Sequence, residues 1–146
     1  METEFNKLDL IDSLSERHHQ LRRIIEELWN DNSNIQLSNS EWFIMARIYK
    51  RQPTIAHVSK SVDISRQATH KLIKKLEAKG LVEINDVEDN KKVKSIRLTT
   101  LGEECYEKNE QLKKTVQKKI SDKIGTEKIN MLKELLQMDW GLDNLD

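Results

Sequence analysis

The stretch that decides how this sequence is interpreted is "SRQATHKLIKKLEAKG", residues 65–80. Ser65 is a residue type that caps the N-terminus of a helix, and Gly80 suits the left-handed position just beyond a helix C-terminus. Between them lie five lysines or arginines and a single carboxylate. The stretch therefore predicts a basic helix, which is either a DNA-reading helix or an ordinary solvated one, and its neighbours decide between the two.

The two faces of this helix differ in character. Apolar residues recur at helical spacing and predict a buried stripe of Ala68, Leu72, Leu76 and Ile73. The outward face is polar and presents Arg66, Gln67, His70, Lys71, Lys74 and Lys75. Because the apolar stripe is committed to a core, the cationic face is available to a polyanion.

The residues before this helix predict two more helices. Ser38 and Glu41 match a capping box at the start of a helix that runs through "WFIMARIYKR". Pro53 ends that helix because proline has no N–H to donate, and Thr54 can cap the next segment, "IAHVSKSV". That segment is separated from the helix beginning at Ser65 by a turn of about three residues, the spacing of a helix-turn-helix.

After the basic helix the period of the sequence changes from 3.6 to 2. Val82 and Ile84 alternate with polar residues, and so do Ile96 and Leu98. The polar segment "NDVEDNKKVK" lies between them. A two-stranded hairpin with a long tip is predicted.

Long amphipathic helices are expected on both sides of this central part. One is predicted from about residue 6 to 30, and another follows a capping box at Thr100 and Glu103. Gly125 should break that helix, and Thr126 can cap a last one. We expect a winged helix-turn-helix domain at 37–100, with helical dimerisation regions at 1–36 and 101–146.

The composition of the sequence limits which partners and which cellular location are expected. Lys and Arg balance Asp and Glu at 25 each, but residues 66–97 hold nine cations and five acids, whereas residues 1–36 hold four cations and eight acids. Hydrophobic residues make up only 36% of the chain, which favours a core completed by a second copy. A single cysteine, no membrane-length apolar run and no signal-peptide pattern favour a cytoplasmic protein without disulfides.

The order helix, helix, turn, basic helix, hairpin is typical of a winged helix-turn-helix, so the predicted fold is mainly α with a small β-hairpin wing. A helix fits the major groove of B-DNA, and its N-terminal N–H groups favour phosphate. Cations at the hairpin tip add a second DNA-facing element. The expected DNA contacts are Ser65, Arg66, Gln67, Thr69, His70, Lys71, Lys74, Lys75, Lys91, Lys92 and Lys94.

The motifs "LSNSEWFIM", "TIAHVSKSVDISRQATHKLIKKLEAKGLVEI" and "NKKVKSIRLTTLG" together resemble the core of the MarR family of bacterial transcription regulators, over roughly residues 37–102. The resemblance implies a homodimer that binds a pseudo-palindromic duplex and usually represses transcription. It also implies release from DNA by a small, often aromatic effector. Carried across, it places DNA contacts at Ser65, Arg66, Gln67, His70 and Lys71.

The wing departs from the family pattern. Where Asp-x-Arg is common in the family, this chain has Asn90, Lys91 and Lys92. Lysine supplies charge but not a bidentate fork. We therefore expect attraction to phosphate by the wing more than reading of the minor groove.

Other side chains have two interpretations each. His18, Trp29 and Trp42 are candidates for the family's effector cleft, although tryptophans on apolar helix faces are more often core residues. A metal site formed by His18 and His19 with other ligands lacks a ligand spacing, so we expect no metal and no cofactor.

Three classes of function remain, and they are given from the most to the least favoured. A sequence-specific DNA-binding repressor is favoured by the helix-turn-helix spacing. The alternative is a winged-helix module that binds protein, such as an anti-repressor or an assembly subunit. An enzyme is disfavoured because the sequence has no nucleophile elbow, phosphate-binding glycine loop, carboxylate dyad or metal motif.

Overall fold

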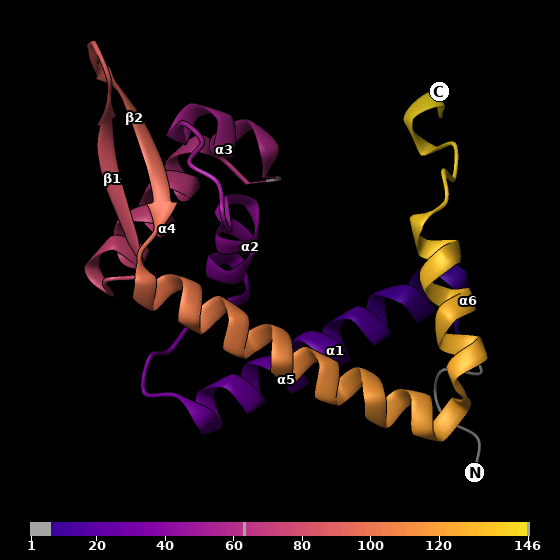
Figure 1. Cartoon of the computed structure of the whole chain (residues 1–146). Helices are drawn as coiled ribbons and strands as arrows, with labels where there is room; N and C mark the ends of the chain where they lie inside the picture. Colours follow the sequence, from indigo (N-terminus) through magenta and orange to yellow (C-terminus); the bar gives the residue numbers. More distant parts are fainter. Residues whose placement is uncertain (1–6, 63, 146) are drawn as a thin grey trace. The chain divides into compact units, whose positions relative to one another are not determined.

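The computed structural model describes residues 7–62 and 64–145, of which Lys91 and Asn144 are described by their backbone alone. The chain is mainly helical with one antiparallel hairpin, as predicted (Figure 1). In chain order the elements are α1 (Leu10–Asn32), α2 (Asn39–Ile48), α3 (Ile55–Ser61), α4 (Arg66–Ala78), β1 (Val82–Val87), β2 (Asn90–Leu98), α5 (Thr100–Ile124), α6 (Thr126–Gln137) and the short η2 (Leu142–Asn144). The chain forms two compact units, Met1–Glu110 and Gln111–Asp146.

Side-chain caps start the first four helices. Asp9 caps α1, accepting from the backbone N–H of Asp12 at 2.8 Å, so this helix begins later than the sequence pattern suggested. Ser38 and Glu41 form the predicted capping box of α2. Thr54 caps α3 by accepting from the N–H of His57 at 3.1 Å. These local hydrogen bonds satisfy amide donors that would otherwise lack partners at a helix start.

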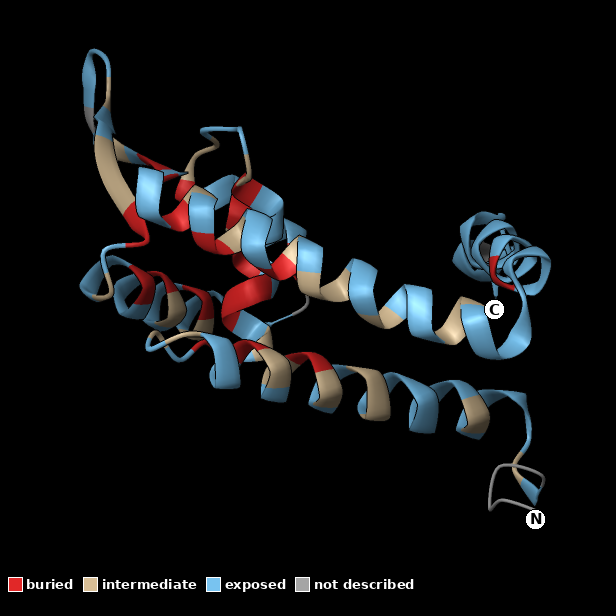
Figure 2. Cartoon of the chain, turned by 60° about the horizontal axis from the view of Figure 1, so that its bottom comes forward, coloured by how far each residue is buried: buried red, intermediate tan, exposed pale blue. Residues whose placement is uncertain are grey.

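The core of the first unit lies where α2, α3, α4 and the hairpin meet (Figure 2). Its fully buried side chains include Ile44, Met45, Ile48, Val58, Ile73, Leu76, Leu81 and Ile96. Each such aliphatic side chain contributes roughly 1.5–3 kcal/mol through its removal from water. The helix-turn-helix is therefore held together mainly by its apolar centre.

The buried stripe of α4 agrees with the prediction at Ile73 and Leu76 and differs from it at the other positions. Thr69, Ile73 and Leu76 are its buried residues, while Ala68 and Leu72 are only half-buried. The sequence pattern had no reason to favour Thr69, because a threonine enters a core only when its hydroxyl finds a partner. The Thr69 hydroxyl donates to the carbonyl of Ser65 at 3.0 Å.

The hairpin is anchored to the segment before α3. β1 and β2 pair in register from Val82–Leu98 to Asp86–Lys94, and the register shifts between Asp86 and Val87. Ile96 N–H donates to the carbonyl of Pro53 at 2.9 Å, and an isolated bridge joins Thr54 to Ser95. The base of the wing is thus fixed to the helix-turn-helix, while its tip extends past the neighbouring helices (Figure 1).

Two of the predicted later caps are placed differently. Thr99, and not Thr100, accepts from the N–H of Gly102 at 3.1 Å at the start of α5. Thr126 is the first residue of α6 and does not cap it; the cap position is occupied by Gly125 at a φ of 102°, without a side-chain hydrogen bond. Gly125 does end α5, as predicted, since a positive φ is readily adopted only by glycine.

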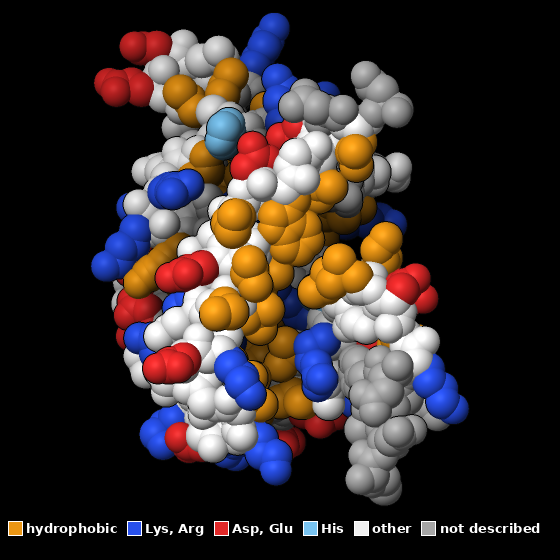
Figure 3. Space-filling model, turned by 90° about the vertical axis from the view of Figure 1, so that its right-hand side faces the viewer, with side chains coloured by type: hydrophobic (Ala, Val, Ile, Leu, Met, Phe, Trp, Pro, Cys, Tyr) orange, Lys and Arg blue, Asp and Glu red, His pale blue; other side chains and the backbone are white. Residues whose placement is uncertain are grey.

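The second unit buries few of its apolar side chains. Of the residues in α6, only Ile129 is buried, and hydrophobic side chains lie open at the surface in the view of Figure 3. The exposed large apolar residues of this unit are Ile124, Met131, Leu132, Leu135, Leu136, Met138, Trp140, Leu142 and Leu145. No helix in the described ranges is long and apolar enough to cross a membrane.

Candidate nucleic-acid interface

The N-terminal turn of α4 is fixed by a serine that is exposed. Ser65 Oγ accepts from the N–H of Ala68 at 3.1 Å. The capped turn carries Arg66 and Gln67, whose side chains are both exposed. A helix N-terminus of this kind favours anions because its N–H groups and its dipole point outward.

The exposed face of α4 brings the predicted side chains together, with one exception. Arg66, Gln67, His70, Lys71, Lys74 and Lys75 are all exposed. Lys74 also forms an exposed ion pair with Glu77 at 3.5 Å, which is worth little in water. Thr69 is the exception, because its side chain is fully buried and cannot reach a ligand from this position.

The C-terminal end of α4 is fastened by a lysine that the DNA-contact prediction left out. Lys79 Nζ donates to the Glu41 carboxylate at 2.7 Å and to the carbonyl of Gln36 at 2.7 Å. The Glu41 side chain is only 5% exposed. A nearly buried carboxylate needs such partners, so the pair joins the end of α4 to the start of α2. Sequence spacing gave no signal for this contact, because the two residues are 38 positions apart.

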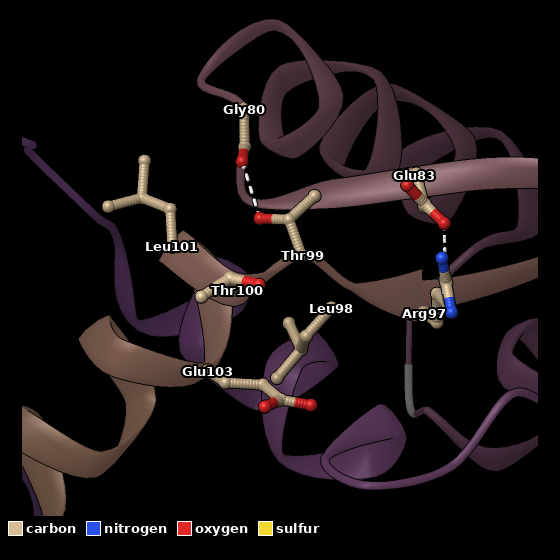
Figure 4. Close-up of a pocket in the computed structure, with 8 residues that line it drawn as sticks. All are labelled: Gly80, Glu83, Arg97, Leu98, Thr99, Thr100, Leu101 and Glu103. Atoms are coloured by element: carbon tan, nitrogen blue, oxygen red, sulfur yellow. Dashed lines mark hydrogen bonds and ion pairs between the residues drawn. The ribbon is translucent and has the colours of Figure 1, made fainter.

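The root of the wing is built around a close backbone approach. The Thr99 hydroxyl donates to the carbonyl of Gly80 at 2.6 Å, and Thr99 N–H donates to the carbonyl of Leu81 at 3.0 Å (Figure 4). A Cβ on Gly102 would lie 2.0 Å from the Leu81 oxygen. This explains in physical terms why the "LTTLG" segment ends on glycine, and it ties the exit of α4 to the start of α5.

A shallow pocket of about 440 Å³ lies at this wing root. Its lining includes the ion pair between Glu83 and Arg97 (Figure 4). The pKa of the Glu83 carboxyl is lowered, first by its hydrogen bond with Arg97 and then by that with Asn85. The surface of the pocket is mainly polar, and we assign it no ligand.

The lysines of the wing are not all equally available to contact a nucleic acid. Lys94 forms an ion pair with Asp86 across the hairpin. Lys92 is exposed, and its backbone N–H donates to the side-chain oxygen of Asn90 at 3.1 Å. The Lys91 side chain lies outside the described residues, so its predicted contact stays a prediction.

The candidate effector residues do not form an open cleft in this structure. Trp29 and Trp42 are buried and contact each other edge to face, with ring centroids 4.8 Å apart and an interplanar angle of 85°. Trp29 Nε1 donates to the carbonyl of Ile35 at 2.6 Å, whereas Trp42 Nε1 has no acceptor among the described residues. His18 is exposed on α1 and lies beside His19. The two tryptophans are core residues here.

Within residues 7–62 and 64–145, no three histidine, cysteine or carboxylate side chains are grouped so that they could hold a metal ion.

Comparison with known proteins shows which sequences and structures this chain resembles. A sequence model described as MarR family matches residues 35–92. A search of curated protein sequences found no match. Among solved structures, MarR of E. coli in its apo form has a TM-score of 0.73 at 18% identity, covering 89% of this chain and 96% of that one.

Two similar structures contain DNA. FabT of Streptococcus pneumoniae in complex with DNA has a TM-score of 0.74 at 22% identity, covering 87% of this chain and 90% of that one. A mutant of E. coli MarR complexed with operator DNA has a TM-score of 0.71 at 18% identity, covering 93% of this chain and 97% of that one. At such identities the likeness shows the fold. The chain has the winged helix-turn-helix fold of these structures, and its residues 35–92 match the sequence model of the MarR family.

Proposed function

We propose that this protein is a homodimeric, sequence-specific DNA-binding transcription regulator that represses by occupying a promoter. The observation that carries the proposal is the exposed cationic face of α4 on a helix-turn-helix with a buried apolar core. That face combines a capped N-terminus with Arg66, Gln67 and Lys71. Two proteins of the same fold were crystallised with DNA, which supports this use of the fold.

The terminal helices supply the support for a dimer. Apolar side chains at both ends of the chain are open to solvent, for example Leu10 at 69%, Ile11 at 75% and Met131 at 61%. Exposed apolar surface on this scale marks an interaction site. A second copy of the chain would cover it, and two recognition helices would then lie about one helical turn apart in successive major grooves.

Release by a small effector belongs to the same proposal. A ligand shifts a conformational equilibrium only by its differential affinity for the two states. It would therefore have to prefer a dimer whose recognition helices are wrongly spaced. Because Trp29 and Trp42 are packed against each other, an effector at these residues would have to separate the two rings.

The experiment that tests the function is fluorescence anisotropy on duplexes tiled across the DNA upstream of the gene, with random duplex as competitor. We expect one tile to bind through the competition with a steep dependence on salt. Equal, weak binding to every tile, with a second search across genomic fragments yielding no preferred site, would overturn the proposal.

A substitution of Lys71 tests whether the exposed face of α4 binds DNA. Lys71→Ala should weaken operator binding by about 5- to 100-fold, because a phosphate or base contact near the helix N-terminus is worth roughly 1–3 kcal/mol. The control is Lys118→Ala on α5, which removes the same charge from an exposed ion pair with Asp122 at 3.1 Å. If both variants bind like the wild type, α4 does not carry the interaction.

One observation favours the alternative of a protein-binding module. The hairpin forms internal ion pairs, Lys94 with Asp86 and Arg97 with Glu83, and these reduce its attraction for phosphate. A module of this kind would show DNA affinity that follows salt and ignores sequence, which the competition with random duplex detects.

A further inference from the structure

The cations in the stem of the wing are held by carboxylates on the opposite strand. Lys94 forms an ion pair with Asp86, and Arg97 with Glu83. The hairpin register places each cation directly opposite its carboxylate, where cross-strand side chains lie closest. The four side chains are between 39% and 55% exposed. They therefore lie where water, salt and an approaching duplex can all reach them.

The two pairs belong to a hairpin without net charge. From Val82 to Leu98 there are four acidic and four basic residues, whereas α4 has four basic residues and one acidic one. Equal charges of opposite sign cancel beyond a Debye length of about 8–10 Å. The attraction that draws the protein to DNA from a distance thus comes from α4, and the wing acts only on contact.

We propose that Asp86 and Glu83 limit the DNA affinity of the wing by holding Lys94 and Arg97 in internal ion pairs and away from phosphate. Asp86 and Glu83 are positioning residues in this scheme, because each acts through its cation. The inference rests on the proposed function and adds a regulation of the same site. Since phosphate contacts carry no sequence information, these carboxylates set how tightly the protein binds and not which sequence it prefers.

The pair nearer the tip gives the cleaner test. Glu83 also accepts from Asn85 at 3.3 Å and lies at the wing root beside the Thr99–Gly80 hydrogen bond, so its removal would disturb the root as well. Asp86 is the last residue of β1 before the register shifts. Both members of its pair are half-exposed, so replacing them should leave the core intact.

The experiment is a double-mutant cycle of Asp86→Asn and Lys94→Met in the full chain. Binding to the operator and to random duplex is measured between about 50 and about 200 mM salt. Asp86→Asn should strengthen binding to both duplexes by about 3- to 10-fold, and the salt slope should steepen by about 0.9, the value for one added phosphate contact on B-DNA. Lys94→Met alone should change affinity less than about two-fold, because the wild-type lysine is already held. In the Asp86→Asn background it should abolish the gain.

The control is Glu88→Gln, which removes the same charge from the hairpin beyond the paired positions of β1. If Glu88→Gln gives the full gain, or if Lys94→Met does not cancel the gain of Asp86→Asn, the effect is one of net charge and the inference is overturned. An Asp86→Asn protein that binds like the wild type overturns it as well. If neither protein prefers any duplex, the proposed function itself fails. Thermal unfolding of each variant separates these results from a loss of folding.

Discussion

At the scale of single residues, Gly102 is the glycine with the least room for an added side chain. A Cβ there would lie 2.0 Å from the Leu81 carbonyl oxygen and 3.2 Å from the Leu98 side chain. The contact is with backbone, which cannot rotate aside as a flexible side chain can. Gly80 differs, because a Cβ there meets nothing within 4 Å, although its φ of 75° still favours glycine.

Gly102→Ala should therefore lower the free energy of unfolding by about 2–3 kcal/mol, the upper part of the range for overpacking. Gly80→Ala is the matched control and should cost only about 1 kcal/mol through backbone strain. Urea denaturation measures both through the transition midpoint. Equal midpoints for Gly102→Ala and the wild type would show that the wing root is looser than the structure indicates.

Cys105 illustrates how burial controls chemistry at one residue. Its side chain is buried on α5, and burial is the largest cause of its raised thiol pKa; Lys108 lowers that pKa and Glu104 raises it. The thiolate is the reactive form. The Cys105 thiol therefore loses its proton at a higher pH in the folded protein than in the unfolded chain.

The native thiol should accordingly react with a disulfide reagent at least about 10-fold more slowly than the urea-unfolded protein at mildly alkaline pH. Because the unfolded thiol ionises first, the contribution of Cys105 to stability should fall as pH rises above the unfolded pKa. Cys105→Ala removes this dependence and serves as the control. A native rate equal to the unfolded rate would contradict the buried position.

At the scale of elements, α4 is positioned from both ends. Ser65 caps its start, and Lys79 joins its end to Glu41 and to the carbonyl of Gln36. The observed buried stripe keeps the predicted Ile73 and Leu76 but contains Thr69, whereas the predicted Ala68 and Leu72 are only half-buried. The helix nevertheless turns the expected lysines outward, because Ile73 and Leu76 face the core as predicted.

Ser65→Ala should lower stability by about 1 kcal/mol and weaken operator binding, since fraying of the first turn releases Arg66 and Gln67 from their positions. Ser65→Asn keeps a capping side chain without adding charge and should restore most of the stability. Ser65→Asp should restore stability as well but weaken DNA binding by repelling phosphate. Circular dichroism melts and anisotropy separate the two effects, and a DNA affinity indifferent to all three substitutions would remove the helix start from the interface.

At the scale of the whole molecule, the distribution of apolar surface points to a second copy. The first unit encloses a core, whereas the second exposes a row of large apolar residues on α6 and the segment after it. Leu135 is 47% exposed in the middle of α6. An isolated chain gains little stability from such residues.

Leu135→Glu should shift the protein from dimer to monomer in sedimentation velocity, because a charge buried in an apolar interface costs several kcal/mol. Lys133→Glu is the control, since two positions of helix turn its side chain about 200° away from Leu135. DNA binding of the Leu135→Glu protein should fall with dimerisation. A monomeric wild type, or a dimer unchanged by Leu135→Glu, would contradict the proposed assembly.

Most of the fold was determined by local sequence. The caps at Ser38, Thr54 and Ser65, the glycine at position 80 and the change of period after it set the helices and the hairpin, because capping, left-handed φ and side-chain periodicity act within a few residues. The same local rules placed the exposed cations of α4. They erred by a residue or more at Thr99, Gly125 and the start of α1, where competing local partners were available.

Only the tertiary structure decided which polar groups find distant partners. Thr69 and Glu41 are buried because the Ser65 carbonyl and Lys79 satisfy them, and Lys94 is held by Asp86 because of the hairpin register. Such pairings depend on which residues the folded chain brings together. A one-residue slip in a strand reverses the face of every side chain, so the charge available to a partner was settled by register and packing.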